Sequence, residues 1–171
     1  MSKQFPTSLI TYAAFASLCI SVIIHFLVGV SELSAVVNDT GTMAFAALML
    51  SGVLVPVVLV AAMASGMVQP KTTYVALSGV MVLYIVAYVD VHALGTLESL
   101  TGADLHTHDG GHDHGADDHD DHGHDDHGHG HDESVLDVVG NHLVDDPLAV
   151  VSKVSEGVAA AFFALLAAGE R

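Results

Sequence analysis

The sequence has few positive charges, a single cysteine and no tryptophan. Its 171 residues include 4 Lys and Arg against 20 Asp and Glu, which gives a formal net charge of −16. Such a chain repels a phosphate backbone and has no cluster of cations to displace its counterions, so nucleic-acid binding is excluded. Because Cys19 has no second cysteine to join, an intrachain disulfide and any cysteine-based zinc motif are excluded as well.

Recognisable catalytic motifs are also missing. The chain contains no phosphate-binding glycine loop, no His-Glu-x-x-His, no Cys-x-x-Cys and no Ser/His/Asp arrangement at a familiar spacing. Charged residues make up only 14% of the chain, apolar residues make up 51%, and the mean hydropathy is +0.55. These values predict an integral membrane protein. Because the catalytic motifs are missing, we expect that the protein is not an enzyme.

Four long apolar runs predict an all-α protein with four transmembrane helices. Residues 9–30, 43–68 and 72–94 are each long enough to cross ~30 Å of hydrocarbon. The fourth run, 148–168, follows Asp145-Asp146-Pro147, and an aspartate N-cap before a first-turn proline favours a helix start. The first run exceeds the length of a signal-peptide core, which favours a membrane span over a cleaved leader.

The few cations predict how these spans are oriented. Lys3 precedes the first span, Lys71 lies between the second and third, and Arg171 ends the chain, whereas the other two connections contain no Lys or Arg. With four spans these three cations fall on one side of the membrane. Because cytoplasmic loops carry the excess of Lys and Arg, we expect both termini in the cytoplasm and the long third connection outside the cell.

Residues 104–133 separate the three-helix region 1–103 from the segments 134–147 and 148–171. This 30-residue tract contains ten His, ten Asp, one Glu and six Gly. With almost nothing to bury, it cannot offset the entropy cost of folding, so we expect a disordered extracytoplasmic loop. The following segment, 134–147, mixes apolar and polar residues in a pattern suited to a short amphipathic helix on the membrane face.

The composition of the tract predicts metal binding. Imidazole is a good ligand for Zn, Ni, Co and Cu ions, and carboxylates add oxygen donors. Because the ligands are spread over a flexible chain, we expect several weak, exchangeable sites rather than one structural site. The candidate ligands are His106, His108, His112, His114, His119, His122, His124, His127, His129 and His131.

Two functions from different classes remain open. In the first, the tract collects divalent metal ions and hands them to, or reports them to, a partner membrane protein or a second copy of the chain. In the alternative, the protein is structural or regulatory and the tract is a solvated spacer. The tract contains eleven acidic side chains and ten histidines, so full protonation of the histidines would reduce its negative charge from −11 to −1. Such a change would make the spacer responsive to pH.

Ionisable residues lie inside the predicted spans, and the ones that could form a cluster toward the outer side are His25, Asp90, Lys153 and Glu156. Ionisable groups at this depth normally face the bundle interior and form pairs. One interpretation is a cation site with ligands from His25, Asp90 and Glu156. The favoured interpretation is structural, with Lys153 paired to Glu156 at i, i+3 and His25 hydrogen-bonded to Asp90.

The tract resembles known His-rich loops. From His106 to His131 it is similar to the His/Asp/Gly loops of the ZIP and cation-diffusion-facilitator metal transporters, and Glu156-Gly157-Val158-Ala159 is faintly similar to part of a ZIP metal-site helix. The resemblance implies contact with divalent metal ions. It does not extend to transport activity, because the other residues of that helix motif are replaced here by Ser152 and Lys153. The composition as a whole resembles small multi-pass membrane proteins of haloarchaea.

Overall fold

The computed structural model describes residues 7–38, 43–101 and 134–170, and every regular element among them is helical. The helices long and apolar enough to span a membrane are α1 (Thr7–Val37), α2 (Met43–Ala64), α3 (Pro70–Val89) together with the π-helical turn η1 (Asp90–Leu94), and α6 (Pro147–Gly169). Two short helices, α4 (Thr96–Thr101) and α5 (Val135–Asp145), adjoin them. The predicted all-α fold with four apolar spans is therefore confirmed for the part of the chain that the structure describes.

Local residue chemistry sets the helix ends. Asp146 caps α6 as predicted, since its carboxylate accepts hydrogen bonds from the amides of Leu148 and Ala149 at 2.9 and 3.1 Å. The predicted end of the second span at residue 68 is wrong: α2 ends at Ala64, because Gly66 adopts a left-handed φ of 74°. The first span is longer than predicted and continues through polar residues to Val37.

The third span ends in an irregular turn. The α-helical hydrogen bonding of α3 changes at Asp90 to the wider π-helical pattern of η1, which ends at Gly95 with a φ of 63°. The short helix α4, which the hydropathy pattern does not predict, follows at once. The chain is therefore redirected where it leaves the bundle.

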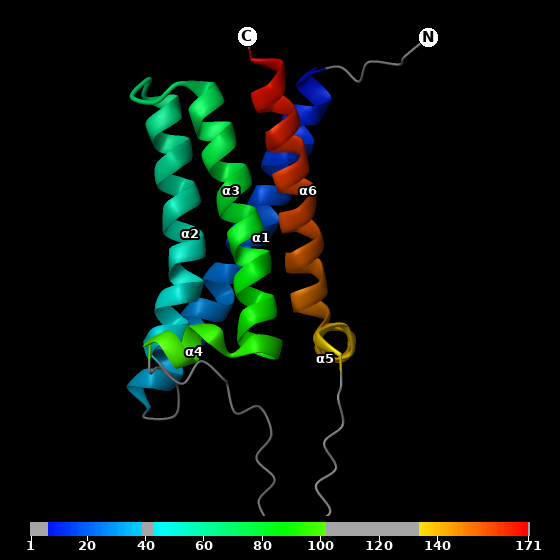
Figure 1. Ribbon diagram of the computed structural model, residues 1–171. Helices are drawn as coiled ribbons and strands as arrows, with labels where there is room; N and C mark the ends of the chain where they lie inside the picture. Colours follow the sequence, from blue (N-terminus) through cyan, green and yellow to red (C-terminus); the bar gives the residue numbers. More distant parts are fainter. Residues whose placement is uncertain (1–6, 39–42, 102–133, 171) are drawn as a thin grey trace, which may run out of the picture.

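The spans form an up-and-down bundle (Figure 1). The first turn of α1, the α2–α3 connection and the last turn of α6 lie at one end, and α4 and α5 lie at the other. α6 packs along both α1 and α3, while α2 packs mainly along α1. The predicted amphipathic segment 134–147 contains a helix, α5, which runs across the base of α6.

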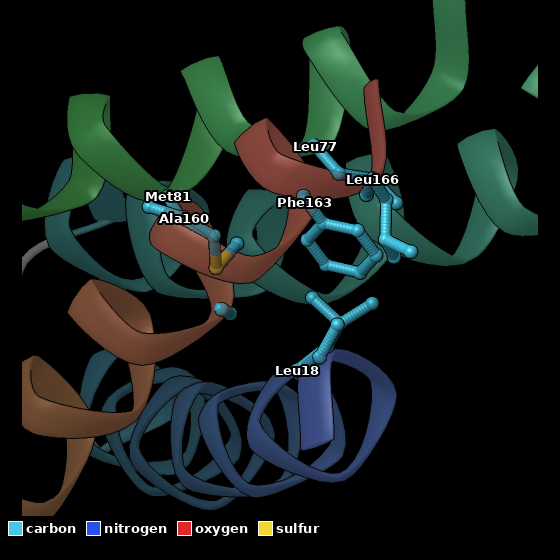
Figure 2. Close-up of a cluster of buried hydrophobic side chains, with 8 residues drawn as sticks. Leu18, Leu77, Met81, Ala160, Phe163 and Leu166 are labelled. Atoms are coloured by element: carbon cyan, nitrogen blue, oxygen red, sulfur yellow. The ribbon is translucent and has the colours of Figure 1, made fainter. Parts of the chain in front are cut away.

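Polar and apolar side chains are distributed as in a protein surrounded by hydrocarbon. The interior around Phe163, which is fully buried, is packed with Leu18, Leu77 and Leu166 (Figure 2). Large apolar side chains also point outward from all four spans, among them Ile23, Leu54, Leu83 and Leu165. Several polar side chains are buried instead: Ser21, His25, Thr73, Asp90, Ser152, Ser155 and Glu156. Hydrocarbon, rather than water, is the solvent in which this distribution is stable.

Candidate functional site

The most polar part of the interior surrounds Glu156, which is fully buried near the middle of α6. Lys153, one turn earlier, donates to both carboxylate oxygens, at 3.0 Å to Oε1 and 2.8 Å to Oε2. The hydroxyl of Ser152 also donates to Oε1, at 2.8 Å. The predicted i, i+3 pair is thus confirmed, and its two opposite charges reduce the cost of holding a carboxylate in the membrane.

The ammonium group of Lys153 is itself enclosed. Its side chain is only 16% exposed, and Nζ lies 5.0 Å from the ring centroid of Tyr88 on α3. The face of an aromatic ring attracts a cation, so Tyr88 supplies a second favourable contact in place of water. The Tyr88 ring also lies against His92, with the two centroids 4.2 Å apart.

His25 approaches the same carboxylate from α1. Its Nε2 lies 3.6 Å from Glu156 Oε1, and its Nδ1 lies 2.9 Å from the backbone oxygen of Ser21. The ring is 3% exposed and meets the ring of Tyr84 edge to face, with centroids 4.8 Å apart. We refer to His25, Lys153 and Glu156 as the ion cluster.

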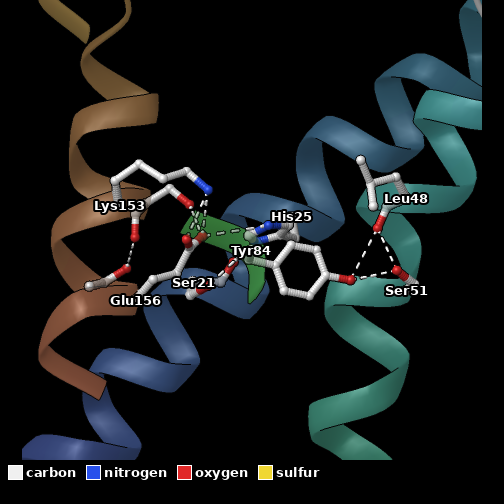
Figure 3. Close-up of polar contacts among 9 residues, drawn as sticks. Ser21, His25, Leu48, Ser51, Tyr84, Lys153 and Glu156 are labelled. Carbon is white, nitrogen blue, oxygen red and sulfur yellow. Dashed lines mark hydrogen bonds and ion pairs between the residues drawn. The ribbon is translucent and has the colours of Figure 1, made fainter. Parts of the chain in front are cut away.

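A hydroxyl network supports the ion cluster from α2 and α3. Tyr84 extends from α3 between His25 and Ser51, and its hydroxyl is hydrogen-bonded to that of Ser51 (Figure 3). The backbone oxygen of Leu48 lies within hydrogen-bond distance of both hydroxyl oxygens, 2.7 Å from that of Ser51 and 3.3 Å from that of Tyr84, so the two hydrogens are shared among three oxygen atoms. The Tyr84 ring is therefore held in the orientation that encloses the imidazole, and all four spans contribute to the surroundings of the ion cluster.

The structure corrects the predicted role of Asp90. Its carboxylate does not bond His25: it accepts hydrogen bonds from the hydroxyl of Thr96 and, at 2.7 Å, from the amide of Leu97. Asp90 begins η1, where the irregular turn aims its side chain at the start of α4. His25 faces Glu156 instead, with Nε2 3.6 Å from Oε1, and Asp90 anchors α4 to the end of α3.

The arrangement does not favour the interpretation in which His25, Asp90 and Glu156 are the ligands of one cation site. The ammonium of Lys153 already bonds both oxygens of Glu156, and Asp90 is directed to α4. Within residues 7–38, 43–101 and 134–170, no three His, Cys, Asp or Glu side chains form a group that could hold a metal ion. The ten predicted ligands, from His106 to His131, lie outside the described residues.

Sequence reasoning found the charged members of the ion cluster but missed the residues that orient them. Ser21 precedes His25 by four residues and Ser152 precedes Glu156 by four, a spacing that brings side chains together on a helix. That signal was available in the sequence. The contributions of Tyr84 and Ser51 were not, because they depend on how α2 and α3 pack.

Comparisons of the chain with protein families, with curated proteins and with solved structures find no match.

Proposed function

We propose that this membrane protein binds divalent transition-metal ions, Zn, Ni, Co or Cu, through the ten histidines of residues 104–133, and hands them to or reports them to a partner. The chemistry of the ligands supports this proposal, because ten imidazoles in a 30-residue tract provide nitrogen donors at high local concentration. The partner is a second membrane protein or another copy of this chain.

One structural observation carries the proposal: the helices that flank the tract, α4 and α5, lie at the same end of the bundle, opposite the first turn of α1 and the last turn of α6 (Figure 1). Both helices also pack on η1. Both attachment points of the tract are thus at one end of the bundle, which in a membrane would place them at one face. The arrangement supports collection of ions at that face and release to a neighbouring protein there.

The distribution of charge supports an orientation for that face. Lys71 lies in the first turn of α3, at the end of the bundle shared with the first turn of α1 and the last turn of α6. The positive-inside bias favours this end for the cytoplasm. The ion cluster argues against conduction of the metal ion itself, since Glu156 is already neutralised by Lys153.

Calorimetry on the full chain in lipid nanodiscs tests metal binding. We expect Zn, Ni, Co and Cu to bind at high salt with more than one ion per chain, and replacement of the ten tract histidines by Asn to abolish the heat. A variant with the order of residues 104–133 shuffled is the matched control, and it should retain binding if the sites are flexible and exchangeable. Equal heats for the parent and the His→Asn variant would refute metal binding and leave the spacer alternative.

Single-cysteine labelling tests the orientation. In a Cys19→Ser background, Asn141→Cys places a thiol on the exposed surface of α5, and Ser65→Cys places one at the α2–α3 turn. A membrane-impermeant maleimide should label only the cysteine at position 141 in intact cells and both after lysis. The opposite pattern would place the tract in the cytosol and refute capture of ions outside the cell.

A further inference from the structure

The contacts of His25 determine which ring nitrogen carries hydrogen. Nδ1 lies 2.9 Å from the backbone oxygen of Ser21, within hydrogen-bond distance of a group that can only accept. The hydrogen must therefore be on Nδ1. The hydroxyl oxygen of Ser21, 3.3 Å from the same nitrogen, is a second neighbour on that side. In the neutral ring, Nε2 then has a lone pair and no hydrogen.

That lone pair faces another acceptor. The group opposite Nε2 is Oε1 of Glu156, at 3.6 Å, too far for a hydrogen bond. Both partners are buried, with exposures of 3% for His25 and 0% for Glu156. Two acceptors held face to face without a hydrogen between them form an unfavourable contact, and one added proton would turn it into a charge-assisted hydrogen bond.

The neighbouring groups leave this position open to a proton rather than to a metal ion. From α6, the ammonium of Lys153 bonds both oxygens of Glu156 and so repels a second, multiply charged cation. From α3, Tyr88 lies beneath Lys153, and the hydroxyl of Tyr84 is bonded to α2 rather than to the imidazole. α2 contributes Gly52 beside the ring and has no titratable side chain between Met43 and Ala64.

We propose that His25 Nε2 and Glu156 Oε1 form a proton-binding site inside the bundle, and that its occupation joins α1 to α6. A proton from the aqueous phase adds to Nε2 and no covalent bond of the protein breaks. The new N–H donates to Oε1 once the two atoms move closer than their present 3.6 Å. The ion cluster passes from neutral to a charge of +1. Nδ1–H stays on Ser21 and Lys153 stays on Glu156 in both states, so the protonated state differs by one interhelical hydrogen bond.

Nitrogen NMR of the full chain in nanodiscs tests the site. The protein carries ¹⁵N-histidine, EDTA removes metal from the tract, and the His25 signals are identified by their loss in His25→Gln. On acidification, Nδ1 should remain protonated while Nε2 gains a hydrogen. In Glu156→Gln the uptake should shift to lower pH by about one unit or more, because the opposing charge is gone. Glu170→Gln, the same change at the exposed end of α6, should shift nothing.

Hydrogen exchange of the unaltered protein supplies a readout that does not depend on any variant folding. After correction for the intrinsic pH dependence of exchange, protection of amides around Ser21 in α1 and Glu156 in α6 should rise together as Nε2 is protonated. Protection in α2 near Val58 should remain constant. A hydrogen on Nε2 rather than Nδ1 at high pH, or uptake unaffected by Glu156→Gln, would overturn the proposal, and so would protection that does not change with pH.

Discussion

Gly52 of α2 lies directly against the imidazole of His25. A methyl group at Gly52 would stand 2.6 Å from Cδ2 of the ring and 3.2 Å from the ring of Tyr84. Side-chain carbons do not approach this closely without displacing their neighbours. The absence of a side chain at Gly52 therefore lets α2 pack close to the imidazole and helps fix the direction in which Nε2 points.

Replacing Gly52 by Ala should destabilise the protein by about 1–3 kcal/mol, because the added methyl group forces the His25 ring to move within a packed interior. The free energy of unfolding can be measured by denaturant titration in detergent micelles. Gly79→Ala in α3 is the matched control, since a methyl group there meets no atom within 4 Å. It should be neutral or stabilising by up to ~1 kcal/mol, because Ala favours a helix over Gly. Equal effects at the two sites would show that the packing at Gly52 is looser than described.

Lys153→Met should destabilise the bundle by ~3–5 kcal/mol, because it leaves the carboxylate of Glu156 buried without its cation. The double variant Lys153→Met/Glu156→Gln should recover much of this loss, since the uncompensated charge is removed. Unfolding of the single and double variants at constant ionic strength measures the coupling.

Lys71→Met is the control for the loss of a lysine. Lys71 is exposed at the start of α3, so its removal should change stability by less than ~0.5 kcal/mol. If the double variant at Lys153 and Glu156 were less stable than the single variant, the ion pair would not be what stabilises this part of α6.

Asp146→Ala should cost ~1 kcal/mol and loosen the first turn of α6, because the amides of Leu148 and Ala149 lose their acceptor. Faster hydrogen exchange at these two amides is the local measurement. Asp146→Ser retains a capping oxygen and should restore most of the protection. Unchanged exchange in Asp146→Ala would mean that the first turn of α6 is held by other contacts.

Ser78→Ala should cost only ~0.6 kcal/mol, the typical value of an interhelical hydrogen bond within a membrane. The hydroxyl of Ser78 donates to the backbone oxygen of Ala160 at 2.9 Å and joins α3 to α6. Ser65→Ala is the control, since its hydroxyl bonds within the exposed end of α2 and joins no two helices. Denaturant titration should separate the two variants, and a loss above ~2 kcal/mol for Ser78→Ala would indicate packing that the single bond does not account for.

The sequence predicted the elements of this fold better than their ends. Long apolar runs are a strong signal, because a helix must hide its backbone from hydrocarbon over the whole membrane thickness. The N-terminal cap of α6 at Asp146 could also be predicted from the sequence, because it depends on three adjacent residues. The end of α2 was missed because hydropathy continues past Ala64, whereas the turn depends on the backbone of Gly66.

The sequence likewise predicted one part of the candidate site and not the other. Ionisable residues are easily recognised within an apolar run of sequence. The ion pair between Lys153 and Glu156 is predicted by their i, i+3 spacing on one helix. The sequence did not predict that His25 lies against Glu156. Asp90 and Glu156 were both at a suitable depth, and the π-helical turn that directs Asp90 to Thr96 has no signature in the apolar pattern.

Taken by itself, the amino-acid order determined the number of spans, the placement of the His/Asp tract between the third and fourth, and the local pairs within α6. These properties depend on hydropathy and on neighbours along one helix. Only the tertiary structure decided that His25 meets Glu156 across α1 and α6, with Gly52 and Tyr84 enclosing the ring. A membrane helix is apolar on nearly every side, so its sequence does not mark which face turns inward; the packing of the four helices does.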